Sequence, residues 1–595
     1  MLRTEHEAGA RASTLGAMVL RACESASGPA LRKPGGADLS YPELGRAATE
    51  IAAGLIELGV RQGDRVAILS DTRPEWTLVD CGALVAGAIV VPIYQTNSPR
   101  ECEYVLQHSG ARVVVCENED QLAKVRSVRH RCPDLEHVVV MEGPAGGDVI
   151  ALDELRARGA HAPGRAAAEL QRPPGADDLA TIVYTSGTTG PPKGCMLTHA
   201  NMLSAMRMYE ARLEVDRARF VVFMFLPLAH VLARVTQMVV LDLGGTIAYW
   251  QRDRSRVLED LAESRPTHVP VVPRVLEKVH ARAVATADEG GPVKRAGLRY
   301  ALAIGAAARR RERSGEAINP LLRGARAVAD RLVLSKVRAL FGDEARLVLT
   351  GAAPIGAEVP WFFDACGLPV MEGYGMTETC AATTLNTPTE FRFGTVGRPL
   401  PGMEIAIADD SEVLMRGPCV FHGYYHDEQA TAEAFDGDWL RSGDLGEIDE
   451  DGYLRITGRK KDVIITSSGK NITPSLIETA LRESRWISEA VVYGDNRPYV
   501  VALLVLDSDE IAALGEHTGA EPDAASMAGD ERVHREIAGV VDEVNRHFAR
   551  IEQVKRFAIL DHDLTQEAGE LTPTMKVKRA VVNDRYRDVF DALYE

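Results

Sequence analysis

The sequence lacks three features that would place the protein in a membrane or outside the cell. No run of apolar residues approaches the roughly 20 that a transmembrane helix needs. The first residues include glutamates where a secretory signal peptide would be basic. The nine cysteines are an odd number without C-x-x-C pairs, which argues against a disulfide framework or a structural zinc site. We therefore expect a cytosolic protein.

Positive charge is scarce overall but concentrated in one segment. The formal net charge of −17 disfavours nucleic acid as a partner. Between Lys294 and Arg338, however, arginines are interleaved with apolar residues, as in basic amphipathic helices. A solvated helical face is the ordinary interpretation of this pattern. The functional alternative is peripheral contact with an anionic membrane, with Arg309, Arg310, Arg311 and Arg313 as the candidate contacts.

At 595 residues the chain is too long for one core, and its character changes near Gly458. Before that point, short apolar strands alternate with helical patterns, which is typical of parallel sheets with helical crossovers. After it, the sequence is compact, charged and of mixed α+β character. We therefore predict an α/β protein with a large N-terminal body and a small C-terminal domain. The predicted strands include 63–69, 88–93, 113–116, 138–141, 246–248, 268–272, 347–350, 491–493 and 499–506.

The most informative stretch runs from Tyr184 to Gly194 and is rich in glycines and hydroxyl groups. Glycines let the backbone turn its N–H groups toward an anion, and Lys193 adds a mobile positive charge. A predicted strand over 179–184 precedes the loop, which therefore lies at a strand end, where ligands collect. Two prolines before the lysine exclude a Walker P-loop. A plain surface turn does not need this combination. We predict that nucleotide phosphates contact Thr185, Ser186, Gly187, Thr188, Thr189, Gly190 and Lys193.

Two further segments have the composition of a nucleotide site. Residues 350–354 are too small to block a flat ligand, although alone they are better explained as a strand-to-helix turn. The segment 372–379 is stronger, because two glycines around Tyr374 let its ring lie against a planar base. Glu378 offers the hard oxygen ligand that Mg²⁺ favours. Its alternative role is that of an acid at a helix N-terminus, beside Thr377 as the N-cap.

Charged residues in the second half complete the pattern. Asp444 is predicted to lie on a tight turn over 441–446, where its carboxylate could accept both hydroxyls of a ribose. An ordinary turn aspartate is the alternative. A basic cluster follows at 458–461, and Lys576 lies on a proline-marked loop near the C-terminus, where a lysine is by default exposed and idle.

Taken together and in this order, these segments resemble the adenylate-forming superfamily of acyl-CoA synthetases, adenylation domains and luciferases. Within it, the chain is most similar to the long-chain fatty-acyl-CoA synthetases, through 469–474, 571–576 and the long insert between Arg274 and Leu347. The resemblance implies two sheet-containing subdomains and a barrel-like part in the body, with a mobile C-terminal lid. It implies domains over 1–458 and 459–595, with a hinge near 459–461.

The resemblance also implies roles for individual residues. The triphosphate would be held by the loop from Thr185 to Lys193. The adenosine site would comprise Gly351, Ala352, Ala353, Glu372, Gly373, Tyr374, Gly375, Met376 and Thr377, with Lys470 as a further nucleotide contact. The remaining roles are adenylation for Lys576, the hinge for Lys461, Mg²⁺ ligation for Glu378, ribose contact for Asp444 and Arg459, and a place on the acyl and thiol route for His230. A lone histidine is more often structural. Many relatives carry Ser-Gly before the adenylation lysine; here Thr574 and Met575 precede it, a form that the long-chain subgroup tolerates.

The expected function is ATP-dependent activation of a long-chain fatty acid. The carboxylate attacks the α-phosphate of ATP, pyrophosphate leaves, and coenzyme A then takes the acyl group from the adenylate. Because both reactants of the first step are anions, Mg²⁺, Lys193 and Lys576 would offset the charge at phosphorus. Transfer to a carrier-protein phosphopantetheine is the alternative, since the same motifs would serve it. A catalytically silent binding protein is disfavoured because all the charged site residues are present together. The sequence leaves both a monomer and a homodimer open.

Overall fold

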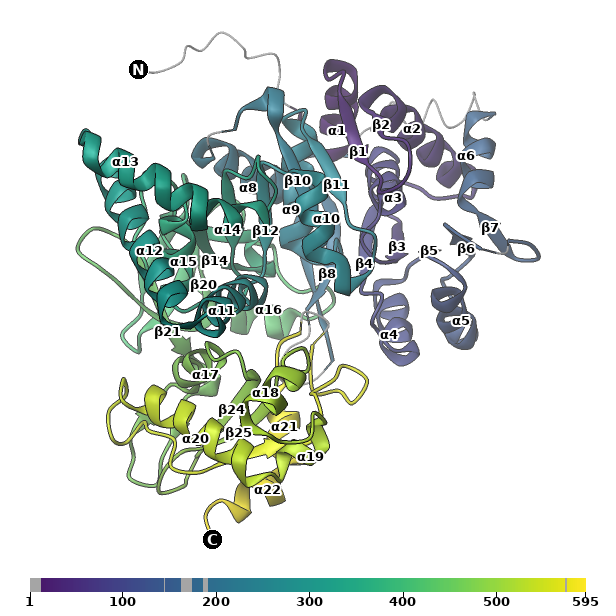
Figure 1. The fold of residues 1–595 in the computed structure, drawn as a ribbon. Coiled ribbons are helices and arrows are strands. Elements are labelled where there is room, and N and C mark those ends of the chain that lie inside the picture. The colour runs from purple at the N-terminus through teal and green to yellow at the C-terminus, as the bar shows by residue number, and fades with distance from the viewer. Residues whose placement is uncertain (1–11, 144, 162–173, 186–190, 214, 573–574) are drawn as a thin grey trace.

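The computed structural model describes the chain except for residues 1–11, 144, 162–173, 186–190, 214 and 573–574. Figure 1 shows a large body of sheets and helices, with a smaller C-terminal domain packed below it. This arrangement confirms the predicted α/β class with its large body and small C-terminal part. Among the described residues, no helix is long and apolar enough to cross a membrane.

The first sheet of the body has seven strands. All neighbours are parallel except the last two, which form an antiparallel hairpin. Its central strands are valine- and isoleucine-rich and buried on both faces, as expected where helices cover a parallel sheet. The spatial order is β7 (Val149–Ala151), β6 (His137–Val140), β5 (Val113–Cys116), β3 (Arg65–Leu69), β4 (Ile89–Ile93), β8 (Leu179–Thr185) and β9 (Lys193–Thr198).

The second sheet has nine strands. Its spatial order is β16 (Arg398–Pro399), β15 (Ala381–Leu385), β14 (Val370–Met376), β13 (Leu347–Thr350), β12 (His268–Val271), β10 (Val221–Met224), β11 (Thr246–Tyr249), β1 (Pro29–Arg32) and β2 (Leu39–Ser40). The strands from β14 to β1 are parallel, and antiparallel pairs close both edges. Because Thr350 is level with Glu372, the two segments predicted to hold adenosine reach the same edge of the sheet.

The third sheet of the body is antiparallel. It consists of β17 (Glu404–Ile407), β18 (Glu412–Arg416), β20 (Trp439–Ile448), β19 (Phe435–Asp436) and β21 (Leu454–Arg459). The tight turn predicted over 441–446 is wrong, because this segment lies inside β20. The glycines that suggested a turn mark irregularities of a strand that pairs on both sides: Gly443 has a φ of 71°, and the register shifts between Leu445 and Gly446.

Helices pack against the sheets of the body (Figure 1). Among the described helices, α2 (Tyr41–Glu57) after Ser40, α4 (Pro99–Ser109) after Ser98 and α8 (His199–Arg212) after Thr198 begin in capping boxes. The others are α1 (Leu15–Ser25), α3 (Pro74–Val85), α5 (Glu119–Val128), α6 (Leu152–Ala160), α9 (Val231–Asp242), α10 (Val257–Ser264), α11 (Pro273–Glu289), α12 (Gly291–Arg313), α13 (Pro320–Ala329), α14 (Ser335–Ala339), α15 (Glu358–Ala365) and α16 (Glu428–Ala434). Short helical turns are η1 (Arg129–Arg131), η2 (Arg217–Arg219), η3 (Arg254–Arg256), η4 (Asp330–Leu334), η5 (Thr377–Thr379) and η6 (Lys460–Asp462).

The C-terminal domain has a core of its own on both faces of a three-stranded sheet. Ile477 and Ile537 pack on one face, and Phe590 packs on the other. The three strands of this sheet are β24 (Ile487–Tyr493), β25 (Val501–Leu506) and β26 (Phe557–Leu560). A separate two-stranded sheet consists of β22 (Ile464–Ile465) and β23 (Asn471–Ile472). The helices are α17 (Pro474–Arg482), α18 (Ile511–Thr518), α19 (Ala524–Ala528), α20 (Glu531–Asn545), α21 (Arg579–Arg585) and α22 (Arg587–Ala592).

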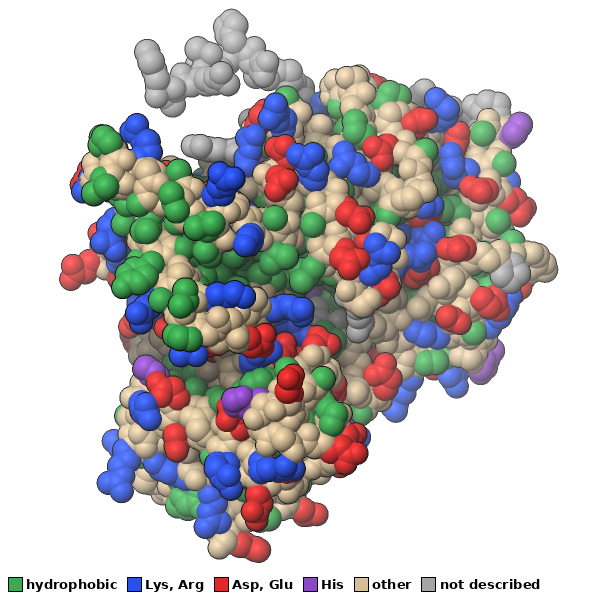
Figure 2. Space-filling view, viewed as in Figure 1, with side chains coloured by type: hydrophobic (Ala, Val, Ile, Leu, Met, Phe, Trp, Pro, Cys, Tyr) green, Lys and Arg blue, Asp and Glu red, His purple; other side chains and the backbone are tan. Residues whose placement is uncertain are grey.

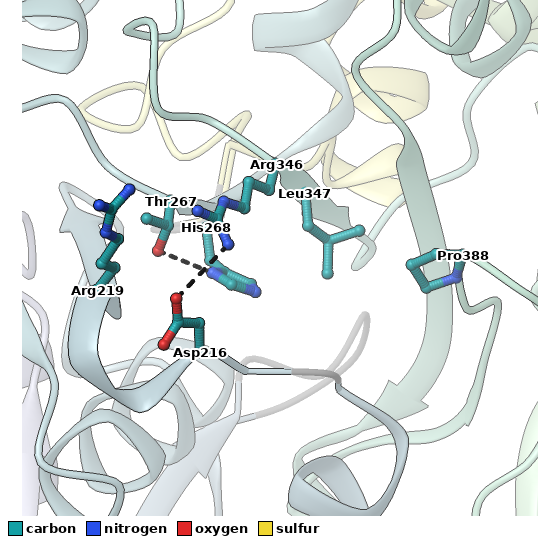
Figure 3. A pocket seen from close by; sticks show the side chains of 7 residues that line it. All are labelled: Asp216, Arg219, Thr267, His268, Arg346, Leu347 and Pro388. Carbon is teal, nitrogen blue, oxygen red and sulfur yellow. Dashed lines mark hydrogen bonds and ion pairs between the residues drawn. The ribbon is translucent and has the colours of Figure 1, made fainter.

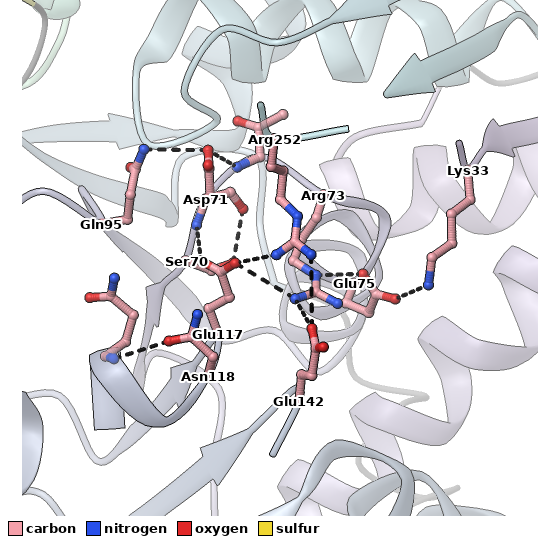
Figure 4. A network of polar contacts seen from close by, with 12 residues as sticks. Lys33, Ser70, Asp71, Arg73, Glu75, Gln95, Glu117, Asn118, Glu142 and Arg252 are labelled. Atoms are coloured by element: carbon pink, nitrogen blue, oxygen red, sulfur yellow. Dashed lines mark hydrogen bonds and ion pairs between the residues drawn. The ribbon is translucent and has the colours of Figure 1, made fainter. Parts of the chain in front are cut away.

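Charged side chains join the first two sheets of the body (Figure 4). Arg252, which follows β11, pairs with Glu117 at the end of β5, 2.5 Å from Nη1 to Oε1. Within the first sheet, Arg73, which follows β3, donates to Glu142 beyond β6 at 3.0 Å, and Arg252 also lies 4.0 Å from Glu142. Glu117 and Arg73 are both buried. Removing one partner of a buried ion pair is strongly destabilising. The pair between Arg252 and Glu117 therefore holds the carboxyl end of the first sheet against the second sheet.

A second pair joins the sheets through their helices. Arg234 of α9 contacts Asp80 of α3 at 2.6 Å, and both side chains are fully buried. Arg234 also donates to the Thr181 hydroxyl of β8, 2.5 Å away. The strand that leads to the predicted phosphate loop is thus fixed to α9, the helix that begins after His230.

Candidate active site

The predicted phosphate loop joins β8 to β9. Its residues Ser186, Gly187, Thr188, Thr189 and Gly190 lie outside the described part of the chain, so the structure places only the two ends of the loop. There Thr185 and Lys193 are paired across the antiparallel hairpin, and the Thr185 hydroxyl donates to the Lys193 carbonyl at 3.4 Å.

Lys193 connects this hairpin to a buried acid. Its ammonium lies 5.0 Å from the centre of the Tyr424 ring, within the range of a cation–π contact. The Tyr424 hydroxyl donates to Glu378 Oε1 at 2.7 Å, and Glu378 is only 6% exposed. Burial, followed by the charge of Glu378, raises the pKa of Tyr424, so the phenol remains a neutral donor. Tyr424 therefore links Lys193, the predicted phosphate contact, to Glu378, the predicted Mg²⁺ ligand.

The sequence prediction misses Tyr424. Its local signal is slight, a glycine followed by two tyrosines at 423–425. Its place in the site comes from tertiary contacts instead: it forms an isolated bridge with Cys195 of β9, and the N–H of Tyr425 donates to the Gly194 carbonyl at 2.8 Å.

The segments predicted to hold adenosine pack against each other at the carboxyl ends of β13 and β14. A Cβ on Gly351 would lie 2.7 Å from the Gly373 carbonyl oxygen, so only glycine permits this approach. Ala352 follows with a φ of 69°, the left-handed region that alanine seldom adopts, and both Ala352 and Ala353 keep solvent contact. The result is a small-residue ledge beside Tyr374.

The rest of this edge is equally constrained. A Cβ on Gly375 would lie 1.8 Å from the Ala381 carbonyl oxygen of β15, so the two strands can approach only at a glycine. Met376 ends β14, and Thr377 begins η5. Burial raises the pKa of Glu372 to about 8, so at neutral pH its carboxyl group is largely protonated and can donate a hydrogen bond.

Asp444 lies at the centre of the second contact group. One of its oxygens accepts from the Tyr374 hydroxyl at 2.9 Å, and the other accepts from Arg459 Nε at 2.8 Å. Asp444 and Arg459 are level with each other on β20 and β21, and Asp444 is 8% exposed. Burial and the adjacent Asp444 raise the pKa of Tyr374. The structure thus brings together three residues that the sequence predicted in separate segments.

Lys576 comes from the C-terminal domain and meets the body at this group. Its loop is closed by two hydrogen bonds with Thr572, at 3.0 and 2.8 Å. Burial of the ammonium, followed by the positive charge of Arg459, lowers the pKa of Lys576, while Asp444 opposes the shift. Burial and Lys576 together lower the pKa of His230 to about 4. The Lys576 ammonium thus interacts electrostatically with Arg459, Asp444 and His230. Lys576 is exposed, and Figure 2 shows the surface hollowed between the two domains.

Three other predicted residues have different positions. His230 caps α9, with Nδ1 accepting from the Leu232 N–H at 3.3 Å, so it serves the fold as well as facing Lys576. Lys461 is exposed in η6. Lys470 is exposed between β22 and β23, where its backbone exchanges hydrogen bonds with Thr466. Within the described chain, no hydrogen bond or ion pair joins Lys461 or Lys470 to the site.

A cavity of about 110 Å³ lies elsewhere, at the amino ends of the second sheet (Figure 3). Leu347 and His268, which begin β13 and β12, form part of its lining with Arg219 and Arg346. The adenosine segments follow the other end of β13. Burial and Arg346 lower the pKa of His268 to about 4, so this histidine is neutral at physiological pH. The cavity is therefore separate from the predicted site.

The site combines a hairpin that carries Thr185 and Lys193, a buried acid, a ledge of small residues and a second lysine from another domain. This is the arrangement expected of an enzyme that activates its substrate with a nucleoside triphosphate. The chain belongs to the AMP-binding enzyme family: residues 21–425 match that family, and residues 461–595 match the AMP-binding enzyme C-terminal domain.

Individual relatives match over nearly the full length. The long-chain-fatty-acid–CoA ligase FadD15 of Mycobacterium tuberculosis is 40% identical over 566 residues, which cover 94% of this chain and 92% of the relative. The long-chain-fatty-acid–CoA ligase ACSBG1 of Rattus norvegicus is 31% identical over 592 residues, covering 94% and 82%. The adenylation domain of a carboxylate reductase from Mycobacterium chelonae superposes with a TM-score of 0.78 at 22% identity, covering 99% and 92%, a likeness of fold.

Proposed function

We propose that this protein is an AMP-forming ligase that joins a long-chain fatty acid to coenzyme A with the use of ATP. The observation that carries the proposal is how lysines from two domains connect to one segment. Lys193 lies over Tyr424, which donates to Glu378. Lys576 interacts electrostatically with Asp444, which accepts from Tyr374. The names of the full-length relatives support the long-chain acid and the coenzyme A acceptor.

The chemistry follows from charge. A carboxylate oxygen attacks the α-phosphorus of ATP, and the bond to the pyrophosphate oxygen breaks. Two anions must approach each other, so preorganised positive charge at the phosphates lowers the barrier. In the proposed reaction, Lys193 acts on the departing phosphates and Lys576 on the α-phosphate. The thiol of coenzyme A then attacks the acyl carbon, and AMP leaves.

Glu378 fits the proposed role of Mg²⁺ ligand. Its carboxylate is buried, one oxygen is oriented by Tyr424, and carboxylate oxygen is a donor that Mg²⁺ prefers. Over the described residues, no group of three or more His, Cys, Asp or Glu could hold a metal alone, so the phosphates of ATP would supply most ligands. When bound, Mg²⁺ would neutralise phosphate charge.

The proposed domains are 1–458 and 459–595, with Lys461 as the pivot. Lys460 Nζ pairs with Glu412 of the body at 3.0 Å and also contacts Asp410, so the chain is anchored up to this residue. Lys461 is the next residue and is exposed. A pivot directly after the last anchor would let the C-terminal domain withdraw Lys576 once the adenylate has formed.

We expect kcat/KM to rise with acyl chain length from four carbons to at least twelve. Each buried methylene contributes about 0.8 kcal/mol, less the cost of ordering the chain. Pyrophosphate release should be measured over a panel of carboxylic acids, each with and without coenzyme A. A preference for acetate or an aromatic acid would contradict the long-chain assignment. Adenylate that forms but yields no thioester with free coenzyme A would favour the carrier-protein alternative.

We further propose that the basic insert contacts an anionic membrane surface. Arg309 and Arg313 are unsuited to this role, because both pair with the buried Asp364. The exposed residues lie instead on α13 and η4, where Leu321, Val328 and Leu332 are 85%, 59% and 60% exposed. Arg331 of η4 and Lys336 of α14, which directly follows η4, are exposed as well. Apolar side chains flanked by cations suit a surface of anionic lipid headgroups.

Vesicle binding should test this surface. We expect vesicles with anionic lipid to bind the protein in a salt-sensitive manner, and the double variant Arg331→Glu/Lys336→Glu to weaken binding at least about tenfold. Arg535→Glu/Arg550→Glu makes the same charge change at exposed positions of the C-terminal domain and should have little effect. Equal loss in both variants would show attraction by net charge alone, and binding insensitive to salt would contradict the proposed surface.

A further inference from the structure

Ion pairs join the two domains at one edge of their interface. Arg274 Nη2 of α11 lies 2.5 Å from Asp507 Oδ2, just beyond β25. Lys278, one turn further along α11, contacts Asp509 at 2.5 Å and Asp507 at 3.6 Å. The cations belong to the body and the acids to the C-terminal domain, so these contacts depend on the orientation of one domain relative to the other.

Asp507 is the best enclosed member of this group. Its side chain is only 6% exposed, and its own loop holds it, because its N–H donates to the Trp486 carbonyl at 2.9 Å and its Oδ1 accepts from the Asp509 N–H at 3.1 Å. A buried carboxylate that loses its cation is destabilised far more than an exposed one. Separation of the domains must therefore rehydrate Asp507.

A separate ion pair across the interface provides a contrast. Arg485 of the C-terminal domain contacts Glu289 at the end of α11, 2.9 Å away, but Glu289 is 64% exposed. Exposed pairs contribute little because water screens them well. The energetic difference between the two contacts lies in burial, which makes Glu289 a matched control for Asp507.

We infer that Arg274 and Lys278, with Asp507 and Asp509, form a latch that holds the C-terminal domain where Lys576 reaches the site. Lys576 belongs to the same domain as Asp507, and its electrostatic interaction with Asp444 and His230 of the body depends on how the two domains are oriented. Arg274 and Lys278 are thus positioning residues for adenylation: they act through Lys576 and must release before thioester formation. This inference rests on the proposed function.

The orientation can be measured without catalysis. All nine natural cysteines are buried, so cysteines placed at two exposed sites can be labelled selectively. Gly297 of α12 and Gly539 of α20 suit this purpose, because a Cβ at either would meet no atom within 4 Å. Energy transfer between dyes at these positions then reports the distribution of domain orientations in the full-length protein.

The latch predicts a split between the two half-reactions. In Arg274→Gln/Lys278→Gln, adenylate formation from acid and ATP should fall about tenfold. Thioester formation from supplied acyl-adenylate should be at least as fast as in the wild type, and the energy-transfer distribution should shift. Asp507→Asn should reproduce this pattern from the other domain. Arg274→Lys keeps the positive charge and should therefore retain most of the wild-type adenylation rate. Glu289→Gln should change the rate of either half-reaction less than about twofold.

Other outcomes would overturn the latch. An unchanged energy-transfer distribution would show that these pairs do not set the orientation, and an equal fall in both half-reactions would show a general structural role. If the wild type catalyses neither half-reaction with any acid, the proposed function fails, and the energy-transfer comparison still decides whether the latch exists.

Discussion

Replacing Lys576 with alanine should slow adenylate formation by about 10²–10³-fold, the loss typical of one charge contact made in the transition state. Thioester formation from supplied acyl-adenylate should stay near the wild-type rate, because the C-terminal domain is proposed to withdraw Lys576 from the site before that step. Single-turnover measurements of each half-reaction give both rates. The reason is the position of Lys576 beside Arg459 and Asp444, at the meeting point of the domains.

The pH dependence provides an internal check on this assignment. Burial and Arg459 lower the pKa of Lys576 from its ordinary 10.5, and only the protonated form supplies the positive charge. Adenylation should therefore decline as the pH rises through that lowered pKa, at a lower pH than the ordinary lysine pKa would give, and this decline should be absent in the alanine variant. Lys578→Ala, two residues further along the same loop, is the control. Equal losses in both half-reactions would contradict the assigned role of Lys576.

Replacing Lys461 with proline should produce the opposite defect. Proline fixes φ near −65°, whereas a pivot must change its backbone angles between the two steps. We expect a burst of about one adenylate per enzyme, followed by steady-state turnover reduced about tenfold or more. Rapid-quench measurement of adenylate and thioester separates the two phases.

Lys461→Ala removes the same side chain but leaves the backbone free, so it should turn over normally. Lys460 is unsuitable as a control, because its ammonium anchors the chain to Glu412 and Asp410. Normal turnover of the proline variant would exclude Lys461 as the pivot and move the hinge elsewhere in the connection.

Local sequence was sufficient for the strands that hold the site but not for the contacts between them. The strand predicted over 347–350 is present with those bounds, because a short apolar run followed by small residues specifies both its burial and its end. The segment 441–446 was mistaken for a turn, because its glycines are compatible with a turn and only pairing to β18 and β21 selects the strand. Local patterns do not record such neighbours.

The partners across the site were beyond prediction for the same reason. Tyr424 meets Glu378 across 46 positions, and Arg274 meets Asp507 across 233. No periodicity or spacing marks such pairs, and each forms only when whole sheets or domains are in place. The resemblance supplied candidate roles for Asp444, Arg459 and Lys576, while the structure showed that they lie together.

The ion pair between Asp80 and Arg234 restricts which amino-acid substitutions this chain can accept during evolution. Each side chain is fully buried, and loss of one partner would leave the other as an isolated charge, at a cost of about 3–5 kcal/mol. Neither residue can therefore be substituted alone without destabilising the fold, although an apolar pair of similar volume could be just as stable. Because Arg234 also holds Thr181 of β8, descendants that keep the position of the phosphate loop must inherit both charges together or replace both in nearly one step.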